Sequence, residues 1–78
     1  MKIRLHLGGH LKYYDEMQRS NLEVEMTEKQ HLEDILIKLK IPVGEIFLVS
    51  INGEIVSMAN AWINTDDHVQ LYPPMGGG

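Results

Sequence analysis

The sequence contains no cysteine among its 78 residues. Disulfide bonds, thiolate metal sites and nucleophilic thiols are therefore excluded for this chain. Proline is scarce as well, and two of the three prolines stand side by side near the end of the sequence, as Pro73 and Pro74. The chain must gain its stability from one small apolar core, because folding buries only roughly 60% of the surface of so short a chain.

Long apolar runs are also absent. No stretch approaches the ~20 apolar residues that a helix needs to span a bilayer. Residues 1–6 alternate charged and apolar side chains, where a signal peptide would have an apolar segment. We therefore expect a cytoplasmic location and no membrane partner.

Basic residues are in the minority, with seven Lys and Arg against eleven Asp and Glu and a formal net charge of −4. Proteins that bind nucleic acids obtain much of their affinity from Lys and Arg on phosphates. We therefore expect no nucleic-acid partner. An acidic chain of this kind suits a protein partner with a basic docking face.

Patterns that would support metal binding or catalysis are missing too. The histidines, His6, His10, His31 and His68, lie on different predicted elements, and no two have the spacing of zinc ligands. We predict no metal site and interpret these side chains as solvated. Gly8-Gly9 has no following Lys-Ser or Lys-Thr, so it is interpreted as a strand exit and not as a phosphate-binding loop.

The carboxylates and serines give no catalytic pattern either. Asp15-Glu16 and Asp66-Asp67 are neighbours on predicted loops, where adjacent side chains diverge, and we interpret both pairs as solvated turns. No serine has a base within a recognisable motif, so nucleophilic catalysis by this chain is not expected.

Two periodicities organise the first half of the chain. Residues 2–7 and 22–26 alternate apolar and polar side chains, which predicts two half-buried strands. Leu32, Ile35, Leu36 and Leu39 then recur at helical spacing, which predicts an amphipathic helix of about three turns. Thr27 and Gln30 fit a capping box at its start, and we expect Pro42 and Gly44 to end it.

The second half reads as strands and turns. Residues 47–51 are rich in β-formers, and Asn52-Gly53 is a strong signal for a type I′ turn, so residues 54–57 should return as a short strand. Residues 58–67 are irregular, with Trp62 and Ile63 predicted to lie under the core. A turn over residues 64–67 should precede a last strand over residues 68–72.

This order of elements predicts an α+β protein with a mixed sheet of four to five strands and one main helix packed across it, the β-grasp or ubiquitin-like fold. In that fold the last strand lies parallel to the first at the centre of the sheet. We expect a domain over residues 1–72 and an extended tail over residues 73–78. The predicted core comprises Ile3, Leu5, Leu7, Val24, Leu32, Ile35, Leu36, Leu39, Val49, Ile51, Val69 and Leu71.

The tail itself carries the most specific pattern. Proline fixes φ and favours extended backbone before it, so residues 72–75 should run out as a stiff spacer. Glycine has no Cβ, so Gly77 and Gly78 could pass through a channel too narrow for other residues. The carboxylate of Gly78 is then the candidate reactive group.

This ending resembles that of the ubiquitin-like sulfur carriers, and most closely that of the small subunit of molybdopterin synthase. The resemblance rests on residues 69–78, Val-Gln-Leu-Tyr-Pro-Pro-Met-Gly-Gly-Gly, and on the turn Ile51-Asn52-Gly53-Glu54. Gly76 stands where the family usually has a small residue such as serine or alanine, so Gly77 and Gly78 are the matching pair. The family generally has a glycine in the turn before the last strand, and this sequence has none there.

The resemblance implies a function in which this chain is not itself an enzyme and binds no cofactor. An E1-like adenylating enzyme would use ATP to activate Gly78, which would then accept sulfur from a sulfur-donating enzyme as a thiocarboxylate. The carrier would next dock on the large subunit of molybdopterin synthase and give up its sulfur for molybdenum cofactor biosynthesis. Gly77 and Gly78 are therefore the reactive end of the chain.

The residues expected to meet partners are those around the start of the tail: Arg4, His6, Tyr72, Pro73, Pro74, Met75 and Gly76. Tyrosine can anchor a complex and methionine can adapt to its partner. Three other functions remain open at this stage. They are a sulfur carrier for thiamine or tRNA thiolation, a covalent protein modifier joined through Gly78, and a non-covalent ubiquitin-like adaptor.

Overall fold

The computed structural model describes residues 2–74, which form a mixed five-stranded sheet with one α-helix across it. The larger sheet contains β1 (Lys2–Leu7), β2 (Asn21–Glu25), β4 (Leu48–Ile51), β5 (Glu54–Val56) and β7 (His68–Tyr72). A small second sheet pairs β3 (Gln30–His31) with β6 (Trp62–Ile63). The helix is α1 (Leu32–Leu39), and three short 3₁₀ turns complete the fold: η1 (Gly9–Tyr14), η2 (Val43–Glu45) and η3 (Met58–Asn60).

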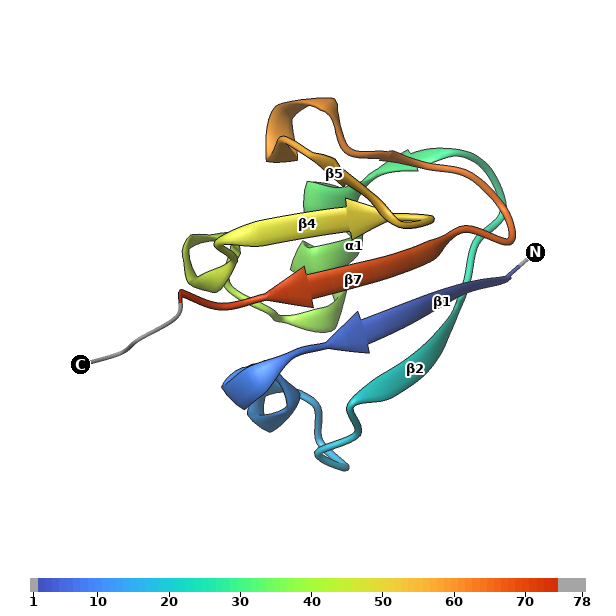
Figure 1. Ribbon diagram of the computed structural model, residues 1–78. Helices are drawn as coiled ribbons and strands as arrows, with labels where there is room; N and C mark the ends of the chain where they lie inside the picture. Colours follow the sequence, from blue (N-terminus) through green and yellow to red (C-terminus); the bar gives the residue numbers. More distant parts are fainter. Residues whose placement is uncertain (1, 75–78) are drawn as a thin grey trace.

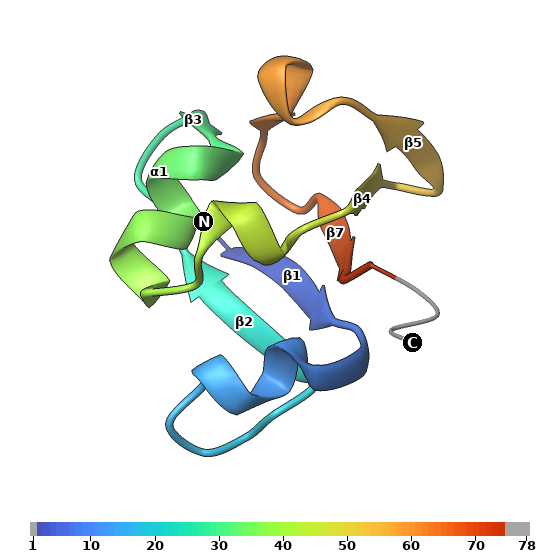
Figure 2. The same ribbon diagram turned by 90° about the vertical axis from the view of Figure 1, so that its left-hand side faces the viewer.

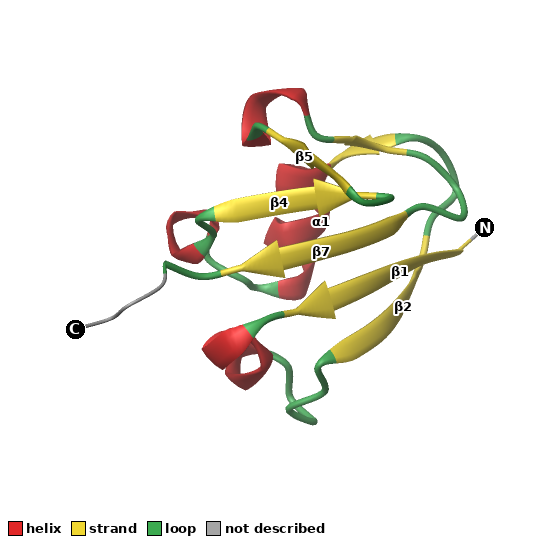
Figure 3. Cartoon of the chain, viewed as in Figure 1, coloured by secondary structure: helices red, strands yellow, loops and turns green. Residues whose placement is uncertain are grey.

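The strands of the larger sheet follow the order β2-β1-β7-β4-β5 (Figure 1). β1 and β7 run parallel in the middle, with Leu5 opposite Val69 and Leu7 opposite Leu71. The neighbouring pairs β1–β2 and β4–β7 are antiparallel. The predicted β-grasp fold is confirmed, including the position of the last strand beside the first. Figure 3 shows how the loops at either end of the sheet connect these strands.

The core lies between the sheet and α1, which covers one face of it (Figure 2). Alternation places the odd-numbered residues of β1 and β7 on the inner face, and Ile3, Leu5, Val69 and Leu71 are buried there. Of the predicted core, Val24, Leu39 and Ile51 are only partly buried. Leu11, Leu22, Met26, Ile41, Ala61 and Ile63 belong to the buried set as well.

The start of the helix differs from the prediction. The capping box at Thr27 and Gln30 is wrong, because Gln30 and His31 pair with β6 and the helix begins only at Leu32. His31 is the N-cap, and its Nδ1 accepts a hydrogen bond of 3.1 Å from the backbone N–H of Glu33. The predicted three turns shorten to about two, at 3.6 residues per turn, because strand pairing competes for the same backbone groups.

The end of the helix also differs in detail. Lys40, directly after the last helical residue, adopts a left-handed conformation with φ of 61°. Its N–H donates to the carbonyl of Ile37, and the N–H of Ile41 donates to that of Leu36, which is the pattern of a Schellman motif. The buried side chain of Ile41 completes the motif, and the predicted stop at Pro42 follows directly after it.

The two turns that were predicted between β4 and β5 and before β7 are present. Asn52 and Gly53 both have positive φ, as a type I′ turn requires. In the turn before β7, Asp66 takes the left-handed conformation at φ of 67°, so this turn forms without the glycine that the family generally has there. The prediction for residues 62 and 63 is half right: Ile63 is fully buried, whereas Trp62 is 52% exposed.

None of the helices within residues 2–74 combines the length and the apolar character that are needed to cross a membrane.

Candidate functional site

The candidate site begins where the central strand ends. β7 finishes at Tyr72 and is followed by Pro73 and Pro74. This end of β7 lies between two loops, the one that holds η1 after β1 and the one that holds η2 before β4 (Figure 1). Met75, Gly76, Gly77 and Gly78 lie outside the described residues, so what the sequence implies for them stays a prediction.

Tyr72 and His6 lie together on the outer face of the sheet, away from α1. Their ring centroids are 5.9 Å apart, with the ring planes tilted by 55°. The His6 ring is also held from the side of β2, since its Nδ1 lies 2.9 Å from the side-chain oxygen of Asn21. The carbonyl oxygen of Tyr72 accepts a hydrogen bond of 2.8 Å from the backbone N–H of Phe47. The tyrosine therefore has a defined place at the strand end.

Arg4 lies on the same outer face but farther from the tail. It is exposed and stands opposite His68 on β7 and Glu23 on β2. His68 precedes Tyr72 by four residues, which is about 13 Å along a strand. The structure thus brings His6 to Tyr72 and places Arg4 in a separate, charged part of the same face.

The two prolines differ in their surroundings. Pro73 is buried, although it follows the last strand, whereas Pro74 is exposed. The predicted spacer over residues 72–75 therefore does not leave the body at Tyr72. The chain stays packed against the domain through Pro73, and Pro74 is the first exposed residue of the tail.

Three apolar side chains were missed as candidate site residues: Phe47 just before β4, Leu48 on β4 and Ile55 on β5. Phe47 and Ile55 are each 70% exposed, and Leu48 stands opposite Tyr72 in the sheet. A shallow groove of about 280 Å³ is lined by Phe47, Leu48, Tyr72 and Pro73. Strand alternation places Leu48 and Ile55 on the outer face with Tyr72. That alternation was a usable signal, but the pairing of β4 with β7 was needed to place Leu48 beside the tail.

Two of the four carboxylates that were interpreted as solvated turns, Asp15 and Asp67, serve as acceptors in their loops, whereas Glu16 and Asp66 are exposed as expected. Asp15 accepts hydrogen bonds from the Arg19 side chain at 3.0 Å and from the Arg19 backbone N–H at 2.9 Å. These bonds lower the pKa of Asp15 from 3.8 to about 2. They also raise the pKa of Arg19 above its ordinary value. This pair fixes the loop between η1 and β2.

Asp67 has a similar role in the loop before β7. Its carboxylate accepts from the side-chain amide of Asn52 and from the backbone N–H of Asn64, both at 2.8 Å. The Asn52 side chain in turn accepts from the N–H of His68 at 2.9 Å. These bonds connect the hairpin turn between β4 and β5 to the start of β7.

Two of the histidines have structural partners, which corrects their interpretation as solvated: the His6 ring lies against Asn21, and His31 caps α1. His10 is exposed, as expected, and lies 3.5 Å from the Glu45 carboxylate. Among residues 2–74, no three His, Asp or Glu side chains come together in a way that could hold a metal ion. The described part of the site is therefore an apolar surface around the end of a central strand.

The sequence matches the model of the ThiS family over residues 10–78. The search of curated proteins found no significant match.

Three solved structures share the fold. One is a chain of the complex between subunits 1 and 2 of molybdopterin-converting factor from Helicobacter pylori 26695, with 22% identity and a TM-score of 0.65 over the whole of both chains. Another is SAMP1 from Haloferax volcanii, with 17% identity and a TM-score of 0.70 over the whole of both chains. The third is the thiamine biosynthesis protein ThiS from Geobacter metallireducens, with 23% identity and a TM-score of 0.57 over 96% of this chain and 99% of that one.

The family match covers most of the chain, and the described fold has the same arrangement as these structures. The chain therefore belongs to the ThiS family, the ubiquitin-like sulfur carriers that its tail resembles.

Proposed function

We propose that this carrier serves as the small, non-catalytic subunit of a molybdopterin synthase-type complex and donates sulfur from Gly78. The observation that carries the proposal is the aromatic-Pro-Pro sequence Tyr72-Pro73-Pro74 at the end of the central strand, followed by Gly77-Gly78. A chain of the molybdopterin-converting factor complex shares the fold, as do SAMP1 and ThiS, so the choice of branch rests on the tail sequence.

The chemistry requires activation by another protein, because a free carboxylate is a poor electrophile. An E1-like adenylating enzyme would join the Gly78 carboxylate to the α-phosphate of ATP, with release of pyrophosphate. Sulfide supplied by a sulfur-donating enzyme would then attack the acyl carbon, displace AMP and leave a thiocarboxylate. ATP is bound by the activating enzyme, and the carrier needs no cofactor of its own.

The surface around Tyr72 suits the docking that both steps require. Tyr72, Phe47 and Leu48 provide apolar contact area beside the tail, and His6 supports the tyrosine ring. Arg4 adds a charged group on the same face. Pro73, Pro74, Met75 and Gly76 lead from this surface to Gly77 and Gly78, so a partner that covers it would receive the reactive end.

Intact mass spectrometry tests the proposal. The chain is incubated with ATP, a sulfur donor and the E1-like enzyme that co-purifies with it from the native cell. We expect the mass gain of one sulfur in place of one oxygen, lost on deletion of Gly78 and strongly reduced by Gly77→Ala. Gly76→Ala and Gly44→Ala should be modified as fast as the wild type, since residue 76 tolerates small side chains in the family and Gly44 has open space around it.

The identity of the acceptor is tested next. The modified carrier should convert a pterin precursor in the presence of a large synthase subunit. Sulfur transfer only to a thiamine precursor or to tRNA would assign the chain to another branch, and an isopeptide bond to lysine would make it a modifier. Full activity without Gly78 would contradict every function that uses the tail.

A further inference from the structure

The paired glycines after β1 lie directly against the start of the tail. A Cβ atom at Gly8 would lie 2.5 Å from Cδ1 of Tyr72 and 2.9 Å from the carbonyl oxygen of Leu71. A Cβ atom at Gly9 would lie 2.8 Å from Cγ of Pro73. These distances are shorter than van der Waals contact, so any side chain at these positions would displace the strand end or the proline ring.

The opposite side of the tail's start is held by the loop before β4. The backbone N–H of Phe47 donates to the carbonyl of Tyr72, and the N–H of Gly8 donates to the carbonyl of Leu71, both at 2.8 Å. The Pro73 ring is therefore buried between the glycines on one side and the Phe47-Leu48 groove on the other. We call this arrangement of Gly8, Gly9, Phe47 and Leu48 the proline seat.

The close contact sets Gly8 and Gly9 apart from other glycines of the chain. A Cβ atom added at Gly44 or Gly53 would meet open space, with no atom of a more distant residue within 4 Å. Gly9 and Gly53 both have positive φ, at 53° and 88°. Gly53 thus has the left-handed backbone of Gly9 but not its close contact. A comparison of the two positions separates a glycine that positive φ favours from a glycine that lack of space requires.

We propose that Gly8 and Gly9 are positioning residues for sulfur transfer, because the proline seat sets the direction in which the chain continues from Pro74. This inference rests on the proposed function of the tail. Proline fixes its own φ and Pro74 restricts the ψ of Pro73, so the position of the Pro73 ring largely determines the path of the backbone through Pro74. A displaced ring would misdirect the carboxyl group of Gly78 even when the body docks correctly.

The expected signature is a loss in turnover with little loss in binding. A misplacement of about 1 Å at a reacting group can reduce a rate by as much as about 100-fold. Docking depends mainly on the side chains of Tyr72, Phe47 and Leu48, and a Cβ at residue 9 would have none of them within 4 Å. For thiocarboxylation by the activating enzyme, we expect Gly9→Asn to lower kcat by about tenfold or more and to leave KM within about twofold of the wild type.

Asparagine is the informative replacement because it tolerates positive φ and still adds a Cβ. The matched control is Gly53→Asn, which also has positive φ but open space around it, and its kcat should equal that of the wild type. Equal kcat in Gly9→Asn and the wild type, or an equal loss of kcat in Gly53→Asn, would overturn the inference.

A measurement without the partner enzymes keeps this test separate from the proposed function. In NMR spectra, Gly9→Asn should shift the Hα and Hδ resonances of Pro73 and Pro74, and Gly53→Asn should not. Unchanged proline resonances would refute the seat even if the wild type is thiocarboxylated. Shifted resonances in a chain that is never thiocarboxylated would support the seat and refute the proposed function.

Discussion

Tyr72 is the last strand residue before the tail, which stays packed against the body through Pro73. Its ring lies on His6 on the outer face of the sheet, and its backbone carbonyl is fixed by Phe47. A half-buried aromatic side chain beside an apolar groove has the features of a binding anchor. Its side chain lies outside the buried core between sheet and helix, so its removal should affect partners more than folding.

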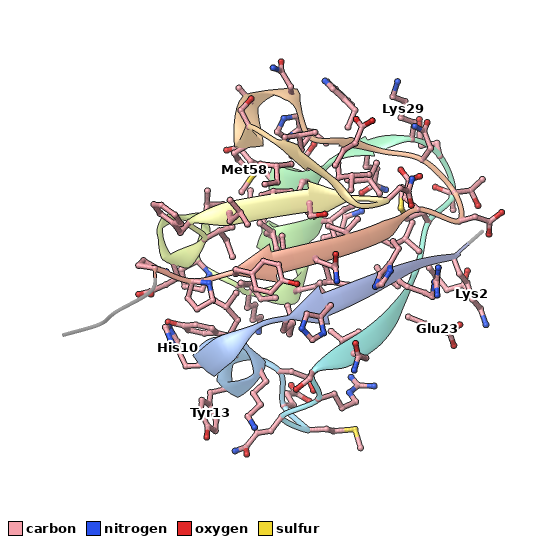
Figure 4. The ribbon with its side chains drawn as sticks, in the orientation of Figure 1. Lys2, His10, Tyr13, Glu23, Lys29 and Met58 are labelled. Carbon is pink, nitrogen blue, oxygen red and sulfur yellow. The ribbon has the colours of Figure 1, made fainter. Side chains whose placement is uncertain are left out.

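We expect Tyr72→Ala to weaken the complexes with the activating enzyme and with the synthase subunit by about 2 kcal/mol each. Isothermal titration calorimetry on both complexes measures this, with Trp62→Ala as the control. Trp62 is also an exposed aromatic residue, and its ring centroid lies 5.9 Å from Nζ of Lys29. Figure 4 shows Lys29 away from the end of β7. Equal losses in both variants, or unfolding of Tyr72→Ala, would contradict a docking role for Tyr72.

The lowered pKa of Asp15 leads to a prediction about how the free energy of unfolding depends on pH. Its pKa in the folded state is lowered to about 2, first through the hydrogen bond to the Arg19 side chain. A carboxyl group with a lowered pKa stabilises the fold above its unfolded pKa, and this stabilisation disappears as the pH falls through the folded pKa. The contribution of Asp15 should therefore be complete above pH 3.8 and lost as the pH approaches 2.

Urea unfolding of the wild type and Asp15→Asn across this pH range tests the prediction. The difference in unfolding free energy between the two proteins should be constant above pH 3.8 and should shrink toward pH 2. A difference that does not change with pH would show that the Asp15–Arg19 pair does not stabilise the loop through the charge of Asp15.

At the scale of elements, the length of α1 is set by the residues that cap its two ends. His31 caps the N-terminus because β3 pairs with β6, and Lys40 closes the C-terminus in a left-handed conformation that usually belongs to glycine. A side chain with a Cβ in that conformation costs roughly 1–2 kcal/mol. Lysine at this position therefore makes the domain less stable than glycine would.

We expect Lys40→Gly to stabilise the domain by about 1 kcal/mol, since it removes this cost and keeps both hydrogen bonds of the Schellman motif. Chemical denaturation gives the free energy of unfolding directly. Gly44→Ala, with open space around it, provides a neighbouring change that leaves the motif intact. A loss of stability in Lys40→Gly would mean that the lysine side chain contributes more than the backbone conformation costs.

At the scale of the whole molecule, the tail leaves from the centre of the sheet. β7 has hydrogen-bonded neighbours on both sides, β1 and β4, and its inner residues are fully buried. β5, by contrast, is an edge strand of three residues with an exposed Ile55. The root of the tail should therefore be in the most stable part of the domain.

Native-state hydrogen exchange tests this distribution of stability. The amides of Leu5, Val69 and Leu71 should exchange most slowly, through global unfolding, and that of Ile55 should exchange through local opening. Comparable protection of Ile55 and Val69 would contradict a tail rooted in the most stable strand pair.

The local patterns of the sequence were sufficient for most of the fold. Alternation in residues 2–7 and the spacing of Leu32, Ile35 and Leu36 identified the buried faces, because one side of each strand or helix must meet the core. The turn at Asn52-Gly53 followed from its need for positive φ. The tail pattern also indicated the family through its resemblance to the endings of known carriers, and the family match over residues 10–78 confirms it.

The tertiary structure decided the features that depend on residues far apart in the chain. The pairing of β3 with β6 moved the helix start from Thr27 to Leu32 and left Trp62 exposed. The parallel pairing of β1 with β7 placed Gly8 and Gly9 against Tyr72 and Pro73, which lie at the other end of the sequence. Periodicity is a local property, whereas a steric fit between two separate loops exists only after the sheet has brought them together.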